Sequence, residues 1–254
     1  MRILFIGDIH GDIRSTWEML DAARRELRIG AAVQVGDFGF FPEILGNLPD
    51  DFPRFPVPLY AIDGNHEDHA WLAACRENRT VEEWKRRLDL HYMERGSVTV
   101  IGGTRFGFLG GALHVDRPQE FDSASGSSNY IQQDDVASAL ERFRNERPDV
   151  IVTHSCPTGI GIGIHGSPIF LPGVLAFISS AGFDAGVEGD CGDSELTRLW
   201  NGLETRPKAW IFGHFHTGIL RRVHDTEFVC VAGIDSRTVT IWDSDEGRLL
   251  FLHF

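Results

Sequence analysis

The stretch MRILFIGDIHG, residues 1–11, carries the pattern that decides the fold. Residues 3–6 form a short apolar, partly β-branched run, which favours a strand buried on both faces. The run ends at Gly7, and Asp8 and His10 follow before Gly11. In extended backbone, residues two apart point the same way, so this carboxylate and this imidazole can aim at one metal ion. The same residues also fit a helix N-cap and a surface histidine at a strand-to-helix turn.

The chain returns to this design four more times, each time directly after a short apolar run. The later motifs are GDFG with Asp37, GNHE with Asn65 and His66, THSCP with His154, and GHFH with His214 and His216. Ligand sites in α/β sheets gather beyond the carboxyl ends of strands, so five such ends can share one crevice. Five unrelated caps and turn histidines are a poorer explanation of the repetition. Carboxylate, imidazole and amide donors without a thiolate suit zinc, manganese or iron.

Composition and charge set limits on the class of protein. The 254 residues contain no repeat, low-complexity tract or linker, which predicts a single domain over residues 1–254. A net charge of −13 argues against extended nucleic-acid binding and against an anionic membrane surface. The four cysteines are scattered without a CxxC pair, as in reduced cytoplasmic proteins. No signal peptide or run of roughly 20 apolar residues is found, so we predict a cytoplasmic protein without a membrane segment.

Strands alternate with helices early in the chain, and strands dominate its middle and its end. A helix capped by Asp12 should begin at Ile13 and stop near Gly30, and a proline-rich loop should cover residues 38–58. Helices are also expected over residues 69–75, 81–88, 131–147 and 193–203. Strands are expected over residues 31–35, 59–62, 149–153, 208–212, 218–223, 227–231, 238–242 and 248–253, with a hairpin at residues 97–111. Residues 112–129 and 155–173 should be loops, the second either a pocket wall or a surface excursion. This alternation predicts an α/β fold of packed sheets with helices outside.

The ordered set GDIHG, GDFG, GNHE, THSCP and GHFH, over residues 7–216, resembles the signature of the calcineurin-like metallophosphoesterase superfamily, with a likeness to bacterial and phage-type members. The resemblance implies two packed mixed β-sheets flanked by helices, a four-layer α-β-β-α sandwich. It implies one metal held by Asp8, His10 and His216, a second held by Asn65, His154 and His214, and Asp37 bridging the two. His66 matches the histidine that acts on the leaving group rather than on a metal.

Two features separate this chain from the protein phosphatase branch of that superfamily. In the run GDFGFFP, Phe40 stands where that branch has the aspartate that orients the catalytic histidine, and Phe41 replaces a phosphate-binding arginine. A phosphoprotein phosphatase is therefore disfavoured. The run GGA at residues 110–112 precedes His114 and Arg117, which are candidate substrate residues or members of an ordinary solvated turn.

The implied ligand set predicts a metal-dependent phosphoester hydrolase. Two divalent cations bring four positive charges, and Asp8 and Asp37 return only two negative ones. The surplus favours a metal-bridging hydroxide that attacks phosphorus in line, while His66 protonates or polarises the departing oxygen. We expect two divalent cations, Mn²⁺ first, with Fe, Zn, Co and Ni as alternatives.

The substrate class follows from the charges around the implied centre. No arginine lies inside the five motifs, which favours a singly charged phosphodiester of small organic or nucleotide type over a phosphomonoester. Phe38, Phe40, Phe41 and the loop at residues 159–168 could form an apolar rim, or the three aromatics could pack beneath the loop. The alternatives are a phosphomonoesterase, a nuclease and a non-catalytic metal-binding interaction module. The last is disfavoured because no implied ligand is missing.

Overall fold

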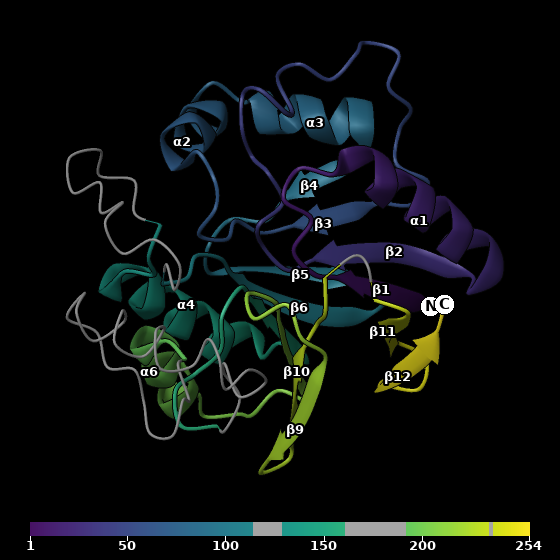
Figure 1. Ribbon diagram of the computed structural model, residues 1–254. Helices are drawn as coiled ribbons and strands as arrows, with labels where there is room; N and C mark the ends of the chain where they lie inside the picture. Colours follow the sequence, from purple (N-terminus) through teal and green to yellow (C-terminus); the bar gives the residue numbers. More distant parts are fainter. Residues whose placement is uncertain (114–128, 161–191, 234–235) are drawn as a thin grey trace, which may run out of the picture.

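The computed structural model describes residues 1–113, 129–160, 192–233 and 236–254. Over these ranges, a pair of six-stranded sheets packs face to face with helices outside (Figure 1). The strand order is β12-β11-β1-β2-β3-β4 in the first sheet and β5-β6-β7-β8-β10-β9 in the second. The predicted fold class, two packed mixed sheets flanked by helices, is confirmed.

The described elements have the following bounds. The helices are α1 (Ile13–Glu26), α2 (His69–Glu77), α3 (Thr80–Leu88), α4 (Gln133–Glu146) and α6 (Ser194–Gly202). The strands of the first sheet are β1 (Arg2–Ile6), β2 (Ile29–Gln34), β3 (Leu59–Ala61), β4 (Leu90–Tyr92), β11 (Thr238–Asp243) and β12 (Arg248–His253). Those of the second are β5 (Ser97–Ile101), β6 (Thr104–Leu109), β7 (Val150–Thr153), β8 (Ala209–Phe212), β9 (Ile219–Val223) and β10 (Thr226–Cys230).

Each sheet contains four parallel strands and two further strands that pair antiparallel. In the first sheet β1, β2, β3 and β4 are parallel, β11 pairs antiparallel with β1, and β12 pairs antiparallel with β11 at the edge. In the second sheet β6, β7, β8 and β10 are parallel, with β5 and β9 antiparallel at the two edges. The carboxyl ends of parallel neighbours meet at one edge of a sheet, which is where ligand sites of α/β proteins form.

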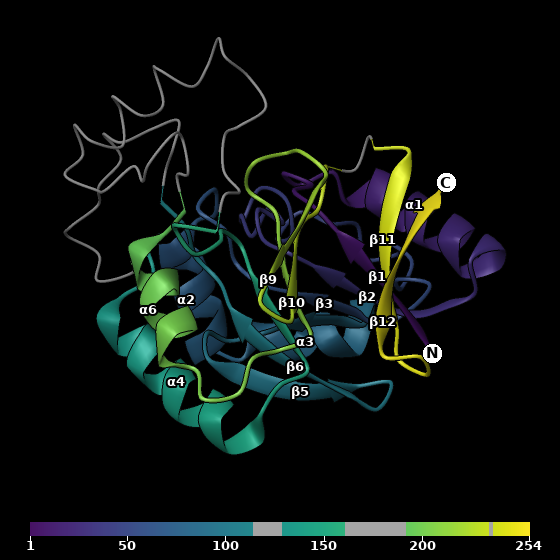
Figure 2. The same cartoon turned by 90° about the horizontal axis from the view of Figure 1, so that it is seen from below.

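Three apolar clusters separate the four layers. Ile3 and Phe5 of β1 lie in the cluster between the sheets, whereas Leu4 and Ile6 lie in the cluster beneath α1, α2 and α3. This alternation follows from the two-residue period of a strand. A third cluster lies between the second sheet and the pair α4 and α6, which run side by side (Figures 1 and 2). Because both faces of β1 are covered, its short apolar run is almost continuous.

The expected elements recur with small shifts at their ends. Asp12 caps α1 as predicted, since its carboxylate accepts a hydrogen bond from the N–H of Ser15 at 3.1 Å. The helix ends at Glu26, a few residues before the expected stop near Gly30, because the chain turns at Arg28, whose φ is 57°, and β2 begins at Ile29. Gly30 instead lies inside β2, where a Cβ would overlap the side chain of Met1.

Strand β4 is an element that the sequence did not predict. It has three residues and follows α3 after a single left-handed residue, Asp89, with φ of 61°. A run this short carries no recognisable period. Most of the two predicted loops, residues 114–128 and 161–173, lies outside the described residues. Within the described ranges, no helix combines the length and the apolar character that crossing a membrane requires.

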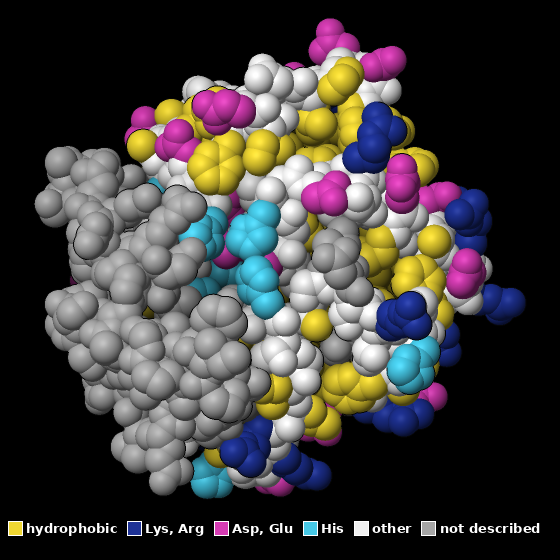
Figure 3. Space-filling model, viewed as in Figure 1, with side chains coloured by type: hydrophobic (Ala, Val, Ile, Leu, Met, Phe, Trp, Pro, Cys, Tyr) yellow, Lys and Arg dark blue, Asp and Glu magenta, His cyan; other side chains and the backbone are white. Residues whose placement is uncertain are grey.

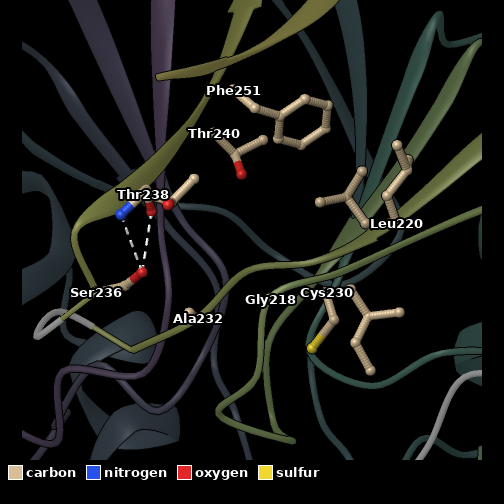
Figure 4. A pocket seen from close by; sticks show the side chains of 10 residues that line it. Gly218, Leu220, Cys230, Ala232, Ser236, Thr238, Thr240 and Phe251 are labelled. Atoms are coloured by element: carbon tan, nitrogen blue, oxygen red, sulfur yellow. Dashed lines mark hydrogen bonds between the residues drawn. The ribbon is translucent and has the colours of Figure 1, made fainter. Parts of the chain in front are cut away.

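The two sheets separate where β9 and β10 face β11 and β12, and a cavity of about 350 Å³ lies between them. Figure 4 shows Leu220 and Cys230 on one side of this cavity and Thr240 and Phe251 on the other. Its lining residues carry hydroxyl and apolar side chains without a formal charge. Leu220 and Phe251 are exposed beside it.

Candidate metal centre

The seven predicted ligands meet at one place, on loops that follow five parallel strands. Asp8, Asp37 and Asn65 follow β1, β2 and β3 of the first sheet, and His154, His214 and His216 follow β7 and β8 of the second. The centre therefore lies across the junction of the two sheets. Figure 3 shows histidine side chains gathered on this face with acidic side chains beside them.

The more exposed half of the centre joins Asp8, His10 and His216. The Nε2 atom of His216 lies 2.8 Å from Oδ2 of Asp8 and 3.4 Å from Nε2 of His10. One ligand atom from each of these residues falls within 4.8 Å of the others. The hydrogen bond to Asp8 raises the pKa of His216, whereas burial lowers the pKa of His10. The two imidazoles and the carboxylate thus form a three-donor group open to solvent.

The buried half is built around His154, which is fully buried. Its Nδ1 lies 2.8 Å from the carbonyl oxygen of Val35, which can only accept, so Nδ1 carries the proton. Its Nε2 lies 3.3 Å from Oδ2 of Asp37 and 3.2 Å from Oδ1 of Asn65. These three atoms face one another, so either a proton on Nε2 or a bound cation must lie among them. Orientation of a ligand histidine by a backbone carbonyl is usual in metal sites.

The electrostatics of this half are those of a cation site. Burial disfavours the charged form of His154, yet the carboxylates of Asp37 and Asp8 raise its pKa to about 10. In the same way His154 holds the pKa of Asp37 well below its usual range, although Asp37 is itself buried. Burial and the neighbouring His154 lower the pKa of His214 well below the ordinary value, which keeps that imidazole neutral and able to bind a metal. The residues present therefore fit divalent cations.

The backbone of His214 is hydrogen-bonded to Asp8, another predicted ligand of the same centre. Its backbone N–H donates to both carboxylate oxygens of Asp8, at 3.2 and 3.1 Å, and its ring centroid lies 5.0 Å from that of His154. The carboxylate of Asp8 therefore contacts both halves, since His154 Nδ1 also lies 3.7 Å from its Oδ1.

His66 lies at the rim of the centre. Its backbone N–H donates to Oδ1 of Asp37 at 2.8 Å, and its ring lies 5.5 Å from that of His10, centroid to centroid. It belongs to neither of the donor groups formed by the described residues around Asp8. The side chain is partly exposed, so it can meet a molecule that approaches from solvent. Its assignment to leaving-group chemistry stays a prediction.

The loops reach this geometry through left-handed backbone. His10, Asp37, His214 and His216 all have positive φ, of 46°, 54°, 69° and 52°. The expectation that His10 projects from extended backbone is therefore wrong. The N–H groups of Ile9 and His10 both donate to the carbonyl of Asp37, at 3.1 and 2.8 Å, and these bonds require the turn. Non-glycine residues with such angles are uncommon and concentrate at functional sites.

Two glycines make the close approach of the loops possible. A Cβ on Gly36 would overlap the ring of His154, and a Cβ on Gly64 would overlap the carboxylate of Asp37. Gly36 also has a φ of 100°. The glycines of the GDFG and GNHE motifs thus leave room for the ligands of other motifs.

Glu67 is a buried residue to which the sequence assigned no role. Its carboxylate accepts hydrogen bonds from the N–H groups of Phe38, Gly39 and Phe40, at 2.8, 3.0 and 2.5 Å, and from Gly64 at 3.4 Å. It therefore joins the loop that carries Asp37 to the turn that carries Asn65. Burial and the nearby Asp37 carboxylate raise its pKa to about 8. Its partners lie up to 29 residues away, so only the quoted GNHE motif could have indicated it.

The sequence left two placements open for Phe38, Phe40 and Phe41, and the first two take the buried one. Phe38 and Phe40 are fully buried, and Phe40 contacts the rings of Phe38 and Trp84 at centroid distances of 4.8 and 5.6 Å. They pack in the core beneath the site, the alternative considered from the sequence, and only Phe41 is partly exposed. The candidate substrate residues His114 and Arg117, and residues 161–168 of the other predicted rim, lie outside the described residues.

Comparisons with known proteins point to one family and one fold. A family model described as calcineurin-like phosphoesterase matches residues 1–218, which is most of the chain and includes every predicted ligand. The chain is also similar to the crystal structure of TT1561 of Thermus thermophilus, with 11% identity and a TM-score of 0.57 over 99% of this chain and 98% of that chain. No curated protein sequence matches the chain.

Two further solved structures share the fold. A putative 5′-nucleotidase from Staphylococcus aureus is 15% identical with a TM-score of 0.54, covering 100% of this chain and 53% of that one. GAP50, described as the anchor in the inner membrane complex of Plasmodium, is 12% identical with a TM-score of 0.51, covering 96% of this chain and 81% of that one. At such identities these likenesses show the fold alone.

Proposed function

This chain belongs to the calcineurin-like phosphoesterase family, which makes metal-dependent phosphoester hydrolysis its reaction class, and we propose that it cleaves phosphodiesters of small organic or nucleotide type with two divalent cations. The observation that carries the proposal is the convergence of Asp37, Asn65 and His154 on one point beside the group formed by Asp8, His10 and His216. Two adjoining donor groups of this kind are what a two-cation hydrolase requires.

The residues of the centre would bind the two cations in two groups that share one carboxylate. Asp8, His10 and His216 would hold one cation, Asn65, His154 and His214 the other, and Asp37 would contact both. Bound divalent cations supply Lewis-acid chemistry, in that they lower the pKa of water and neutralise phosphoryl oxygens. We propose Mn²⁺, because carboxylate, amide and imidazole donors without a thiolate suit it, with Fe, Zn, Co and Ni as the other candidates.

His66 would deliver a proton to the departing oxygen. Its backbone bond to Asp37 places it beside the centre, while its partly exposed ring remains outside both donor groups of the described residues. A histidine in that position can donate a proton to an alkoxide or phenoxide as the ester bond breaks. Such help is worth on the order of 10²–10⁴-fold in rate.

The charges around the centre favour a diester. The largest electrostatic influences on Asp37, His154 and His216 come from other histidines and carboxylates, and none comes from a lysine or arginine of the described residues. A phosphomonoester carries nearly two negative charges at neutral pH and is usually bound with fixed cations. A diester carries one charge, which the metals alone can balance.

The test is a comparison of matched esters. Metal-free protein is reloaded with Mn²⁺, and kcat/KM is measured for an aryl phosphate monoester and for the corresponding diester. We expect the diester to be preferred. A preference of more than about tenfold for the monoester, roughly 1.4 kcal/mol in transition-state binding, would assign the chain to phosphomonoesterases instead. Absence of hydrolysis of either ester with all five candidate metals would remove the proposal.

A further inference from the structure

A buried ionic cluster holds the turn that presents Asn65. The first residue of that turn, Asp63, is almost completely buried. Its Oδ2 accepts from Nε and an Nη of Arg95 at 3.0 and 2.7 Å, and its Oδ1 accepts from the hydroxyl of Tyr92 at 3.0 Å. The Arg95 guanidinium keeps the pKa of Asp63 below its usual range even though burial acts in the opposite direction. Hydrogen bonds therefore hold both oxygens of Asp63, two residues before a predicted metal ligand.

Arg95 extends this cluster from the first sheet to the second. Its other Nη donates to Oδ2 of Asp135 and to the carbonyl of Tyr130, both at 3.0 Å. The same carboxylate oxygen of Asp135 accepts from the N–H of Gln132 at 2.9 Å and so caps helix α4. One guanidinium thus connects the loop after β3 with the start of the helix that covers the second sheet.

The end of β6 joins the same cluster. The N–H of Gly111 donates to the carbonyl of Asp63 at 2.9 Å, and a Cβ on Gly110 would overlap the Asp63 carboxylate. The next residue, Ala112, donates to the carbonyl of Asn129 at 3.1 Å. The turn that carries Asn65 and His66 is consequently fixed against β6 and α4, which lie in other layers of the sandwich.

The arrangement depends on the shape of arginine. Removing one partner of a buried ion pair lowers the free energy of unfolding by about 3–5 kcal/mol. A protein in which apolar residues replace both partners is often as stable as the original. A lysine keeps the charge but has one nitrogen, which cannot reach two carboxylates and a carbonyl in three directions. We therefore expect this cluster to fix the position of the turn that carries Asn65, in addition to any effect on stability.

We propose that Arg95 is a positioning residue for the metal centre, acting through Asp63 on Asn65. The inference rests on the two-cation function proposed above. The hydrogen bonds of Arg95 and Tyr92 given above run to the loop after β3 and to the start of α4, away from the loops that carry Asp8, His10 and His216. Loss of Arg95 should therefore weaken chiefly the cation bound through Asn65, His154 and His214. A smaller effect on the other cation is expected through Asp37, whose Oδ1 accepts from the N–H of His66 in the same turn.

The experiment titrates metal-free protein with Mn²⁺ in a calorimeter and records thermal unfolding of each metal-free variant. Arg95→Lys should weaken one of the two binding events by about 10–100-fold, the usual effect of altering a residue that orients a ligand. Tyr92→Phe keeps the ion pair and removes one hydrogen bond to Asp63, so a smaller loss at the same event is expected. If Arg95→Lys does not fold, Tyr92→Phe still tests the inference.

The matched control is Arg54→Lys. Arg54 donates to a carboxylate oxygen of Asp89 and to the carbonyl of Arg86, the same kinds of acceptor, but it is exposed and remote from the cluster. It should leave both binding events unchanged. Asn65→Ala identifies the affected event, and in that background Arg95→Lys should cause no further loss.

Three outcomes decide the matter. Selective weakening of the event that Asn65→Ala also weakens supports the inference. If wild-type protein binds two cations, the inference is overturned when Arg95→Lys leaves both Mn²⁺ affinities unchanged. It is also overturned when Arg95→Lys lowers both affinities equally. Wild-type protein that binds a single cation overturns the two-cation proposal itself, and the inference with it.

Discussion

Replacing Glu67 by glutamine tests how the loop of Asp37 is held. The carboxylate accepts four backbone N–H groups, two on each oxygen. Glutamine has nearly the same shape, but its NH₂ group cannot accept, so two of the four donors lose their partner in either orientation of the amide. A buried donor left unpaired costs about 1–3 kcal/mol, which gives a loss of about 2–6 kcal/mol in the free energy of unfolding.

A second effect opposes this loss. Burial and Asp37 raise the pKa of Glu67 to about 8, so at neutral pH this side chain takes up a proton as the protein folds, a cost that glutamine does not have. At neutral pH we therefore expect the lower end of the range, about 2–3 kcal/mol. Because the folded pKa lies above the unfolded value of 4.5, the contribution of Glu67 is complete below that value and declines as the pH rises toward 8. The difference between the two proteins should shrink over that window.

The assay is urea unfolding of metal-free wild type and Glu67→Gln at pH 5, 6, 7 and 8. Glu94→Gln is the matched control, because Glu94 is exposed and its pair with Arg76 at 3.3 Å should be worth little. Equal stability of wild type and Glu67→Gln at pH 5 would refute the reasoning. So would a difference that grows as the pH rises.

Three further predictions concern the centre and its support. Asp37→Ala should lower metal binding at both positions, whereas His10→Ala should lower it at one. Elemental analysis of fully loaded protein measures the number of cations per chain. A single cation per chain in wild-type protein would contradict this prediction. His66→Gln should leave metal content near normal and reduce kcat on the order of 10²–10⁴-fold, most for esters with poor leaving groups; a parallel loss of metal would make His66 a ligand. Phe40→Ala should cost about 3–5 kcal/mol in urea unfolding, because the ring is fully buried, yet leave the ratio of diester to monoester kcat/KM unchanged. A changed ratio would return Phe40 to the substrate rim.

Much of the architecture was predictable because its signals are local. Alternate residues of the apolar run at residues 3–6 pack against the helices on one face of the sheet and against the second sheet on the other. Asp12 lies directly before the helix that it caps. That the seven predicted ligands would lie close together was predictable for a similar reason, since each follows a strand by a few residues. Their assignment to two cations came from the family resemblance and remains a prediction.

What the sequence did not indicate depends on partners far along the chain. Asp63 and Arg95 are 32 residues apart, and Arg95 and Asp135 are 40 apart, so no short spacing links them. The turn at Arg28 was misplaced because a neighbouring glycine is the usual candidate for a left-handed residue. The burial of Phe38 and Phe40 was left open because a loop of this composition can lie over a core or beside a pocket.

The pairing of β1 with β11 has a consequence for how the protein is made. Arg2–Phe5 pair with Thr240–Asp243, so the strand that precedes Asp8 has a neighbour on only one side until residues 240–243 have been made. At about 5–20 residues per second, roughly 10–40 s separate the synthesis of Asp8 from that of His216. Throughout that interval the nascent chain holds the carboxylate side of the centre without its last imidazoles. A centre with all seven predicted ligands can therefore form only after His216 has been made.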